Sequence, residues 1–83
     1  MLGRTIEHRV GPYIIRHDGQ LTSAYEIWSD DRPINAPWAW ADSGIGAHML
    51  CLAADLADAI IKKDETREAT ARQAIVDFAN SLP

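Results

Sequence analysis

The feature that most constrains the fold is the run Ser43–Lys63, which is predicted to form one long and unusually apolar helix. Between Gly44 and Lys63 the less apolar residues recur four, three, four, three and four positions apart, in a single stripe along a 3.6-residue helix. The rest of the circumference is apolar, so we expect the helix to be buried on two or more sides. Ser43 is the expected N-cap, because its hydroxyl can accept from a free amide of the first turn.

The length of the chain leaves room for one domain, residues 1–83. A chain of this size buries only about 60% of its extended surface, so its core is thin and a partner could add to its stability. We expect four parts: an antiparallel sheet in 1–35, a tryptophan-containing connection in 36–42, the central helix in 43–63 and a C-terminal helix in 64–83.

The sheet is predicted from alternating patterns near the N-terminus. Arg4–Val10 alternates in polarity, as a half-buried strand does, and Gly11-Pro12 interrupts it as an edge, a bulge or a turn. The pattern resumes at Tyr13–His17. Asp18-Gly19 is the strongest short hairpin signal in the chain and predicts a two-residue type I′ turn.

That turn would set the register and hence the two faces of the sheet. In this register Ile14 faces Ser23 and Val10 faces Ile27. The face expected in the core carries Val10, Ile14, Leu21, Tyr25 and Ile27. The opposite face carries Tyr13, Ile15, Thr22, Ala24, Glu26 and Trp28.

The connection to the long helix begins with a second turn, at Asp30-Asp31, which would return a short edge strand, Arg32–Asn35. The segment 36–42 then carries Trp38 and Trp40. Two interpretations stay open for these tryptophans: they cover the core, or one of them anchors a partner, because tryptophan is enriched at interface hot spots.

The C-terminal helix is predicted over about Thr66–Asn80, after the capping sequence Asp64-Glu65. Its apolar residues recur at four, three and four, and the break before it is short, so the two helices form an antiparallel hairpin. The fold class is therefore α+β: a three-stranded antiparallel meander followed by a helical hairpin (βββαα), with the long first helix packed on the sheet.

Three polar residues of the helical stripe, His48, Cys51 and Asp55, invite a chemical interpretation. A histidine and a cysteine on one helical face resemble a nucleophile pair, and the three together could supply zinc ligands with His8 or His17. No CxxC or HxxxH pair supports a metal, and a smooth helix face is no cleft. We therefore expect no enzymatic activity, no metal and no cofactor.

The charge of the chain is uneven. The net charge is −4, and all of it falls in residues 29–83, because residues 1–28 balance to zero. This argues against direct binding to nucleic acid or to an anionic membrane, and a basic partner is the natural complement. The absence of a signal-peptide pattern and the lone Cys51 lead us to expect a cytoplasmic protein, and the central helix looks too short and too interrupted by acids to span a bilayer.

The function expected from these features is that of a small, acidic, non-enzymatic protein-binding module. Its most concrete form is an inhibitor that docks on a basic surface of a nucleic-acid-handling complex, and in size and charge the chain resembles phage-encoded anti-CRISPR proteins. The residues expected to contact the partner are Asp30, Asp31, Asp55, Asp58, Asp64, Glu65 and Glu68 as charges, with Trp28 and Trp38 as apolar anchors.

Two alternatives follow from the second face of the sheet. A homodimeric structural protein would join through Tyr13, Ile15 and Trp28. A nucleic-acid-binding sheet would stack single-stranded bases on Tyr13 and Trp28, with Arg9 and Arg16 nearby, although this region has no net positive charge.

Overall fold

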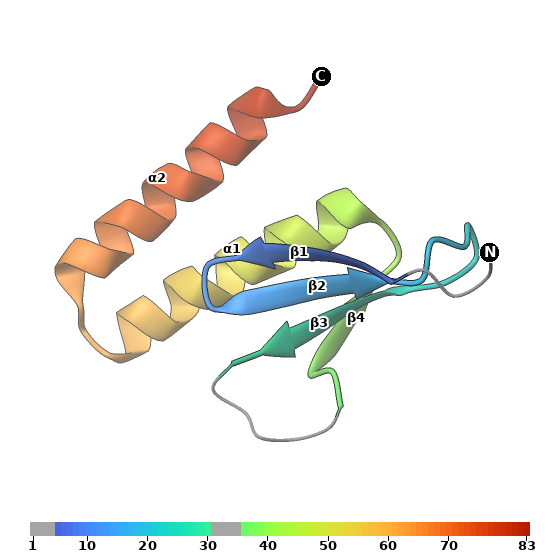
Figure 1. The fold of residues 1–83 in the computed structure, drawn as a ribbon. Helices are drawn as coiled ribbons and strands as arrows, with labels where there is room; N and C mark the ends of the chain where they lie inside the picture. The colour runs from blue at the N-terminus through green and yellow to red at the C-terminus, as the bar shows by residue number, and fades with distance from the viewer. Residues whose placement is uncertain (1–4, 31–35) are drawn as a thin grey trace. The chain divides into compact units, whose positions relative to one another are not determined.

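A computed structural model describes residues 5–30 and 36–83. The described elements are four strands followed by two helices, β1 (Ile6–Val10), β2 (Tyr13–His17), β3 (Tyr25–Ser29), β4 (Ala39–Ala41), α1 (Gly44–Ile61) and α2 (Glu65–Ser81) (Figure 1). The strands form one antiparallel sheet in the order β1-β2-β3-β4. The predicted α+β class is confirmed, with four described strands where three were expected.

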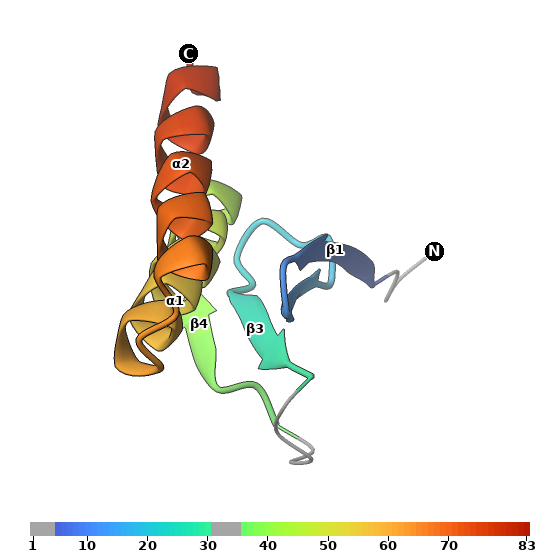
Figure 2. The same cartoon turned by 90° about the vertical axis from the view of Figure 1, so that its left-hand side faces the viewer.

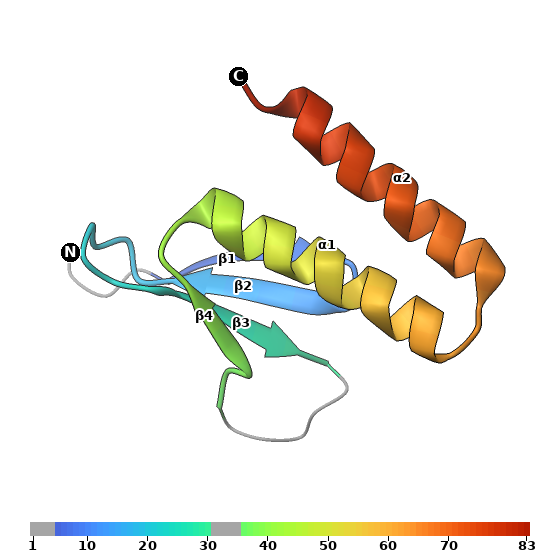
Figure 3. The ribbon, with the colours of Figure 1, turned by 180° about the vertical axis from the view of Figure 1, so that it is seen from behind.

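The chain divides into two compact units, Met1–Cys51 and Leu52–Pro83. The first contains the sheet and the first two turns of α1. The second contains the remainder of α1 and all of α2, which form a helical hairpin around the corner at 62–64 (Figures 1 and 3). Each unit is described by itself below.

A tight turn divides the first predicted strand into β1 and β2. Val10 pairs with Tyr13, so only Gly11 and Pro12 lie between the two strands. Gly11 has a φ of 58°, which fits the first central position of a type II′ turn, and Pro12 supplies the negative φ that the second position needs. Of the three interpretations of Gly11-Pro12, the turn is the one that the structure confirms.

The predicted two-residue turn at Asp18-Gly19 is wrong. β2 ends at His17 and β3 begins only at Tyr25, so seven residues connect them. Asp18 organises this loop: one carboxylate oxygen accepts from the amide of Gln20 at 2.9 Å and the other from the hydroxyl of Ser23 at 2.7 Å. These local bonds hold the backbone in a wider loop, where a type I′ turn would have closed the hairpin at once.

The longer loop changes the register and corrects the predicted faces. Ile15 pairs with Ile27, whereas the prediction paired Ile14 with Ser23 and Val10 with Ile27. The buried strand residues are Val10, Ile15 and Ile27, which are 8%, 6% and 0% exposed. Leu21, expected in the core, is fully exposed in the loop.

The second face was also predicted wrongly. Cross-strand partners share a face, and alternate residues of a strand point to opposite faces. Tyr13 and Ile15 therefore share the face of buried Ile27, while Ile14 and Trp28 form a cross-strand pair on the other face. Neither the dimer surface of Tyr13, Ile15 and Trp28 nor the stacking platform of Tyr13 and Trp28 exists as one surface.

The predicted tryptophan connection contains a strand. β4 pairs with β3 through Tyr25–Ala41, Glu26–Trp40 and Ile27–Ala39, and it leads by a short connection into α1 (Figures 2 and 3). The amide of Trp38 donates to the carbonyl of Ile27 at 2.9 Å just before β4 begins. The expected strand Arg32–Asn35 and the turn residue Asp31 lie outside the described residues.

The start of α1 packs on the face of the sheet that carries Ile27. Ser43 is its N-cap, as predicted, because its hydroxyl accepts from the amide of Gly46 at 3.0 Å. A Cβ atom at Gly44 would lie 3.6 Å from the ring of Tyr25, so the helix backbone lies close to the sheet. In these first turns Ala47 and Cys51 are fully buried.

The prediction that α1 is buried on two or more sides is wrong at several positions. Ile45, Met49, Ile60 and Ile61 are exposed, Ile61 to 77%. The helix carries more apolar circumference than a small chain can cover, which agrees with the thin core expected for 83 residues.

By length and composition alone, α1 is able to cross a membrane, with a mean hydropathy of 1.5 over 18 residues. The expectation that this run is too short and too acidic for a span is therefore not supported on these two criteria. The core helix of a soluble protein passes the same test, and the cytoplasmic location stays a prediction.

The corner between the helices is closed by backbone hydrogen bonds. Lys63 has a φ of 55°, its amide donates to the carbonyl of Ile60, and the amide of Asp64 donates to that of Ala59, which is the Schellman pattern. Asp64 then caps α2 by accepting from the amide of Arg67 at 3.1 Å. The predicted helix Thr66–Asn80 is confirmed to within one residue at each end.

The positive φ of Lys63 gives a first prediction. A side chain in this conformation brings its Cβ close to the carbonyl oxygen, so Lys63→Gly should raise the free energy of unfolding by about 1 kcal/mol. Urea denaturation followed by circular dichroism measures the change. Lys63→Ala removes the same charge but keeps the Cβ, so it should give no comparable gain; equal stability of the two variants would contradict the explanation.

Candidate functional site

The face of the sheet turned away from α1 carries a row of four side chains, one from each strand. Glu7 pairs with Arg16, Arg16 with Glu26, and Glu26 with Trp40 across the four strands. We call this surface the outer face, and it consists of Glu7, Arg9, Ile14, Arg16, Glu26, Trp28 and Trp40. It combines both signs of charge with two tryptophans, whereas the opposite face is largely apolar.

The charged groups of the outer face are partly paired within the chain. Arg16 donates to Glu7 at 2.8 Å, and its Cζ lies 5.1 Å from the centre of the Trp28 ring. The indole N–H of Trp28 donates to Glu26 at 3.1 Å. Acid, guanidinium and indole therefore interact in sequence across this face, an arrangement that orients Arg16 and Trp28.

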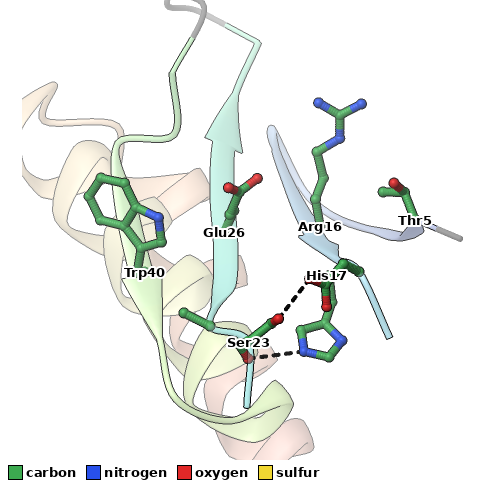
Figure 4. A pocket seen from close by; sticks show the side chains of 8 residues that line it. Thr5, Arg16, His17, Ser23, Glu26 and Trp40 are labelled. Carbon is green, nitrogen blue, oxygen red and sulfur yellow. Dashed lines mark hydrogen bonds between the residues drawn. The ribbon is translucent and has the colours of Figure 1, made fainter. Parts of the chain in front are cut away.

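A hollow of about 470 Å³ opens at one end of this row (Figure 4). The side chains of Trp40 and Glu26 project from β4 and β3, and the side chain of Arg16 lies opposite them on β2 (Figure 4). Trp40 is 59% exposed, a large value for a residue of its size within a strand. The lining residues are Thr5, Arg16, His17, Asp18, Ser23, Ala24, Glu26 and Trp40.

The loop after β2 forms a fixed wall of this hollow. Nδ1 of His17 accepts from the amide of Gly19 at 3.1 Å, so the proton of the neutral ring is on Nε2, which donates to the carbonyl of Ser23 at 3.1 Å. The His17 ring stacks on Tyr25, with centroids 4.0 Å apart. Hydrogen bonds from Ser23 and from the amide of Gln20 hold the pKa of Asp18 below its usual value, so this carboxylate is ionised at neutral pH.

Asp30, one of the predicted contact residues, lies at the other end of the outer face. It forms an ion pair with Arg9, with Nη1 and Oδ2 2.6 Å apart. The hydrogen bond from Arg9, together with its charge, holds the pKa of Asp30 below the usual range, while the same pair raises the pKa of Arg9. Both side chains are about half exposed, so solvent screens the pair.

The predicted acids of the helical unit are mostly paired within it. Arg67 bridges Asp55 at 2.6 Å and Asp58 at 2.7 Å, and Lys62 adds a contact to Asp58 at 3.1 Å. Hydrogen bonds from Arg67 and then Lys62 lower the pKa of Asp58, and the two carboxylates raise the pKa of Arg67. The bridge joins α1 to α2 inside this unit.

The remaining predicted acids stand at the start of α2. Asp64 is the N-cap described above, and Glu68 forms an ion pair with Arg72 at 3.1 Å. Glu65 is exposed, and the described residues offer it no lysine or arginine partner. Among the described acids of the prediction, Asp30 therefore belongs to the sheet unit, and Asp55, Asp58, Asp64, Glu65 and Glu68 belong to the helical hairpin.

The three tryptophans differ in their surroundings. Trp28 lies on the outer face, as described, and Trp38 is half-buried with its ring 5.5 Å from that of Tyr13. The indole N–H of Trp38 is buried and has no hydrogen-bond partner among residues 5–30 and 36–83. Trp40, which was not among the predicted contact residues, is the most exposed of the three, and the alternation of Ala39, Trp40 and Ala41 was the signal that could have indicated it.

Two residues of the predicted polar stripe of α1, Cys51 and His48, are buried and half-buried. Cys51 is fully buried, and this burial raises the pKa of its thiol to about 11. The His48 ring lies 5.7 Å from that of His8; its pKa is lowered by burial and then by the charge of His8. Within the described ranges, no group of three His, Cys, Asp or Glu side chains is placed to hold a metal ion.

Comparisons with known proteins add no assignment to this geometry. No family model matches the chain, and neither the curated proteins nor the solved structures contain a match. Any function must therefore be inferred from the residues themselves.

The surroundings of Cys51 give a second prediction. A pKa of about 11 in place of 9.0 lowers the thiolate fraction at pH 8 about a hundredfold, and burial excludes the reagent. Labelling by a disulfide reagent should therefore be at least about a hundredfold slower in the native protein than in urea. Native labelling as fast as that of the unfolded chain would restore the nucleophile hypothesis.

The histidine pair gives a third prediction. The pKa of His48 is lower in the folded chain than its ordinary 6.5, so the unfolded chain binds the proton more readily. The stability contributed by neutral His48 is complete above about pH 6.5 and is lost as the pH falls through that value toward the folded pKa. The urea midpoint should therefore fall between pH 7.5 and 5.5, a window above the titration of Asp18, Asp30 and Asp58, whose pKa values lie below 3.8.

The controls for this prediction are two variants, each of which replaces one histidine of the pair. His48→Gln should flatten the pH dependence, and His8→Gln should flatten it less, because burial is the larger cause of the shift and remains in that variant. An unchanged slope in His48→Gln would show that other groups control stability in this range.

Proposed function

We propose that this chain is a non-enzymatic protein-binding module that contacts a partner of basic character through the outer face of its sheet. The observation that carries the proposal is Trp40, a tryptophan 59% exposed beside the carboxylate of Glu26 on the four-stranded sheet. Exposed aromatic residues on a preorganised surface are typical of binding hot spots, because they bury a large area at a small cost in conformational entropy.

The charge of the chain supports a basic partner. The net charge is −4, and a partner of opposite sign gains both in encounter rate and in orientation. Glu26, Asp18 and the exposed Glu65 are carboxylates that no described lysine or arginine neutralises. The raised pKa and full burial of Cys51 favour a structural role for this residue, which is why a catalytic role forms no part of the proposal.

The more specific hypothesis, an inhibitor that docks on a basic surface of a nucleic-acid-handling complex, stays a proposal within this one. Its proposed charge donors include Asp55 and Asp58, whose negative charge Arg67 already offsets in part. Glu65 has no such ion pair among the described residues and is the sharper test, whereas a change at Asp64 would also remove a helix cap.

A homodimeric structural protein is the second candidate, and β1 favours it. β1 is an edge of the sheet and pairs within the described residues only with β2, and Ile6 on this strand is 57% exposed. An exposed edge strand is a template for pairing with a second copy. Light scattering across a concentration series tests this candidate, since a monomer at every concentration would remove it.

The fourth prediction tests the proposed function with matched bait proteins. Wild type, Trp40→Ala and Ile61→Ala are immobilised and exposed to nuclease-treated lysate of the source organism, and retained proteins are quantified by mass spectrometry. A specific partner should be retained by wild type and reduced at least about tenfold with Trp40→Ala, the loss expected for a hot-spot tryptophan.

Ile61→Ala is the control because it removes an equally prominent exposed side chain, 77% accessible, from the helical unit. It should keep the partner. A partner retained equally by all three baits would contradict the outer face as the contact surface, and loss of the partner on nuclease treatment would indicate binding through nucleic acid.

A further inference from the structure

We propose that the hollow lined by Trp40 and Glu26 binds an arginine side chain of the partner, with the guanidinium stacked on the indole and paired with the carboxylate. This inference rests on the proposed function and names the chemistry that its contact surface selects. The hollow, of about 470 Å³, is large enough to receive a long side chain, and its walls come from three strands and a hydrogen-bonded loop (Figure 4).

The chain itself contains the arrangement that this proposal invokes. On the same face, Arg16 pairs with Glu7 at 2.8 Å and places its Cζ 5.1 Å from the centre of the Trp28 ring. Acid, guanidinium and indole thus form a complete set at Glu7, Arg16 and Trp28. Glu26 and Trp40, direct neighbours across β3 and β4, repeat the acid and the indole.

In this second set, no lysine or arginine among the described residues forms an ion pair with the acid, Glu26. The described hydrogen-bond partner of Glu26 is the neutral indole N–H of Trp28, which occupies one carboxylate oxygen. Arg16, although it lines the hollow, donates to Glu7. The other carboxylate oxygen of Glu26 and the exposed ring of Trp40 remain available to a ligand.

The charge around the hollow selects a cation over an anion. Its lining contains two carboxylates, Asp18 and Glu26, against one guanidinium, Arg16, whose charge Glu7 already offsets. Asp18 is ionised at neutral pH, as its lowered pKa requires. An entering cation therefore meets an excess of negative charge next to an aromatic face, the combination that attracts cations most strongly.

The shape of the site favours arginine over lysine. A guanidinium is planar, so it can stack on the flat indole of Trp40 while its N–H groups point sideways toward Glu26. A lysine ammonium is a more strongly hydrated point charge and gains less from stacking. Arginine is also a common residue among interface hot spots, in keeping with a contact that anchors a protein partner.

The fifth prediction tests the site with defined probes. The full chain, labelled with ¹⁵N, is titrated with the capped peptides Gly-Gly-Arg-Gly-Gly, Gly-Gly-Lys-Gly-Gly and the same peptide with citrulline, which has the shape of arginine without its charge. The arginine peptide should shift the indole resonance of Trp40 and the amide of Glu26. Citrulline should bind at least about fivefold more weakly, because the charge-assisted contact and the cation–π contact are both lost.

Two carboxylate variants provide the matched control. Glu26→Gln keeps an oxygen that can accept from Trp28 but removes the charge, so it should weaken the arginine peptide at least about threefold. Asp77→Asn removes one charge from an exposed site on α2, keeps an oxygen that can accept from Gln73, and should leave the affinity unchanged. Dispersed amide spectra confirm that both variants are folded.

Several outcomes would overturn the inference. Equal affinity for the arginine and citrulline peptides, no effect of Glu26→Gln, or tighter binding of methyl glucoside or of a short single-stranded DNA at Trp40 would each reject an arginine site. The proposed function is judged separately: if Trp40→Ala loses the partner while the arginine peptide fails to bind, the protein-binding proposal stands and this inference falls. If the baits retain the partner equally, the outer face itself is rejected.

Discussion

The pairing of Ile15 with Ile27 is the constraint on which the rest of the sheet depends. Ile27 is fully buried, with Ile15 on one side and Ala39 on the other. Because side chains alternate along a strand, this pairing sends Glu26 and Trp28 to the outer face. A slip of one residue would bury Glu26 and expose Ile27, at a large cost in desolvation, so core and outer face are determined together.

The limits of prediction from sequence are clearest at this pairing. Ile14 and Ile15 are adjacent and equally apolar, so alternation alone does not say which one faces inward. The prediction relied on Asp18-Gly19 as a type I′ turn, and that choice selected Ile14. In the structure, Asp18 bonds forward to Gln20 and Ser23, and His17 bonds to Gly19, so side chains of this loop compete with the tight turn.

The helices were predicted more accurately because their signals are local. The caps at Ser43 and Asp64 act within three residues, whereas a strand is specified by a partner that is distant in sequence. The same difference between local and long-range signals explains which residues of the site could be predicted. Trp28 was recognised from its own chemistry, but the significance of Trp40 depends on Glu26 lying beside it, which only the register provides. The acids were predicted as free charges, and for Asp30, Asp55, Asp58 and Glu68 the intrachain partners come from the fold.

These intrachain partners also determine at which carboxylate a basic ligand gains the most binding free energy. Asp55 and Asp58 already lie 2.6 and 2.7 Å from the guanidinium of Arg67, so part of their negative charge is offset within the chain and a partner's cation gains less from them. Glu26 keeps its bond to a neutral indole and still offers an oxygen, so a new ion pair there is gained almost entirely. Trp40 adds buried area and a π-face to that one contact. Thus, in a chain with a net charge of −4, we expect binding to depend on the carboxylate beside Trp40 more than on the number of acids.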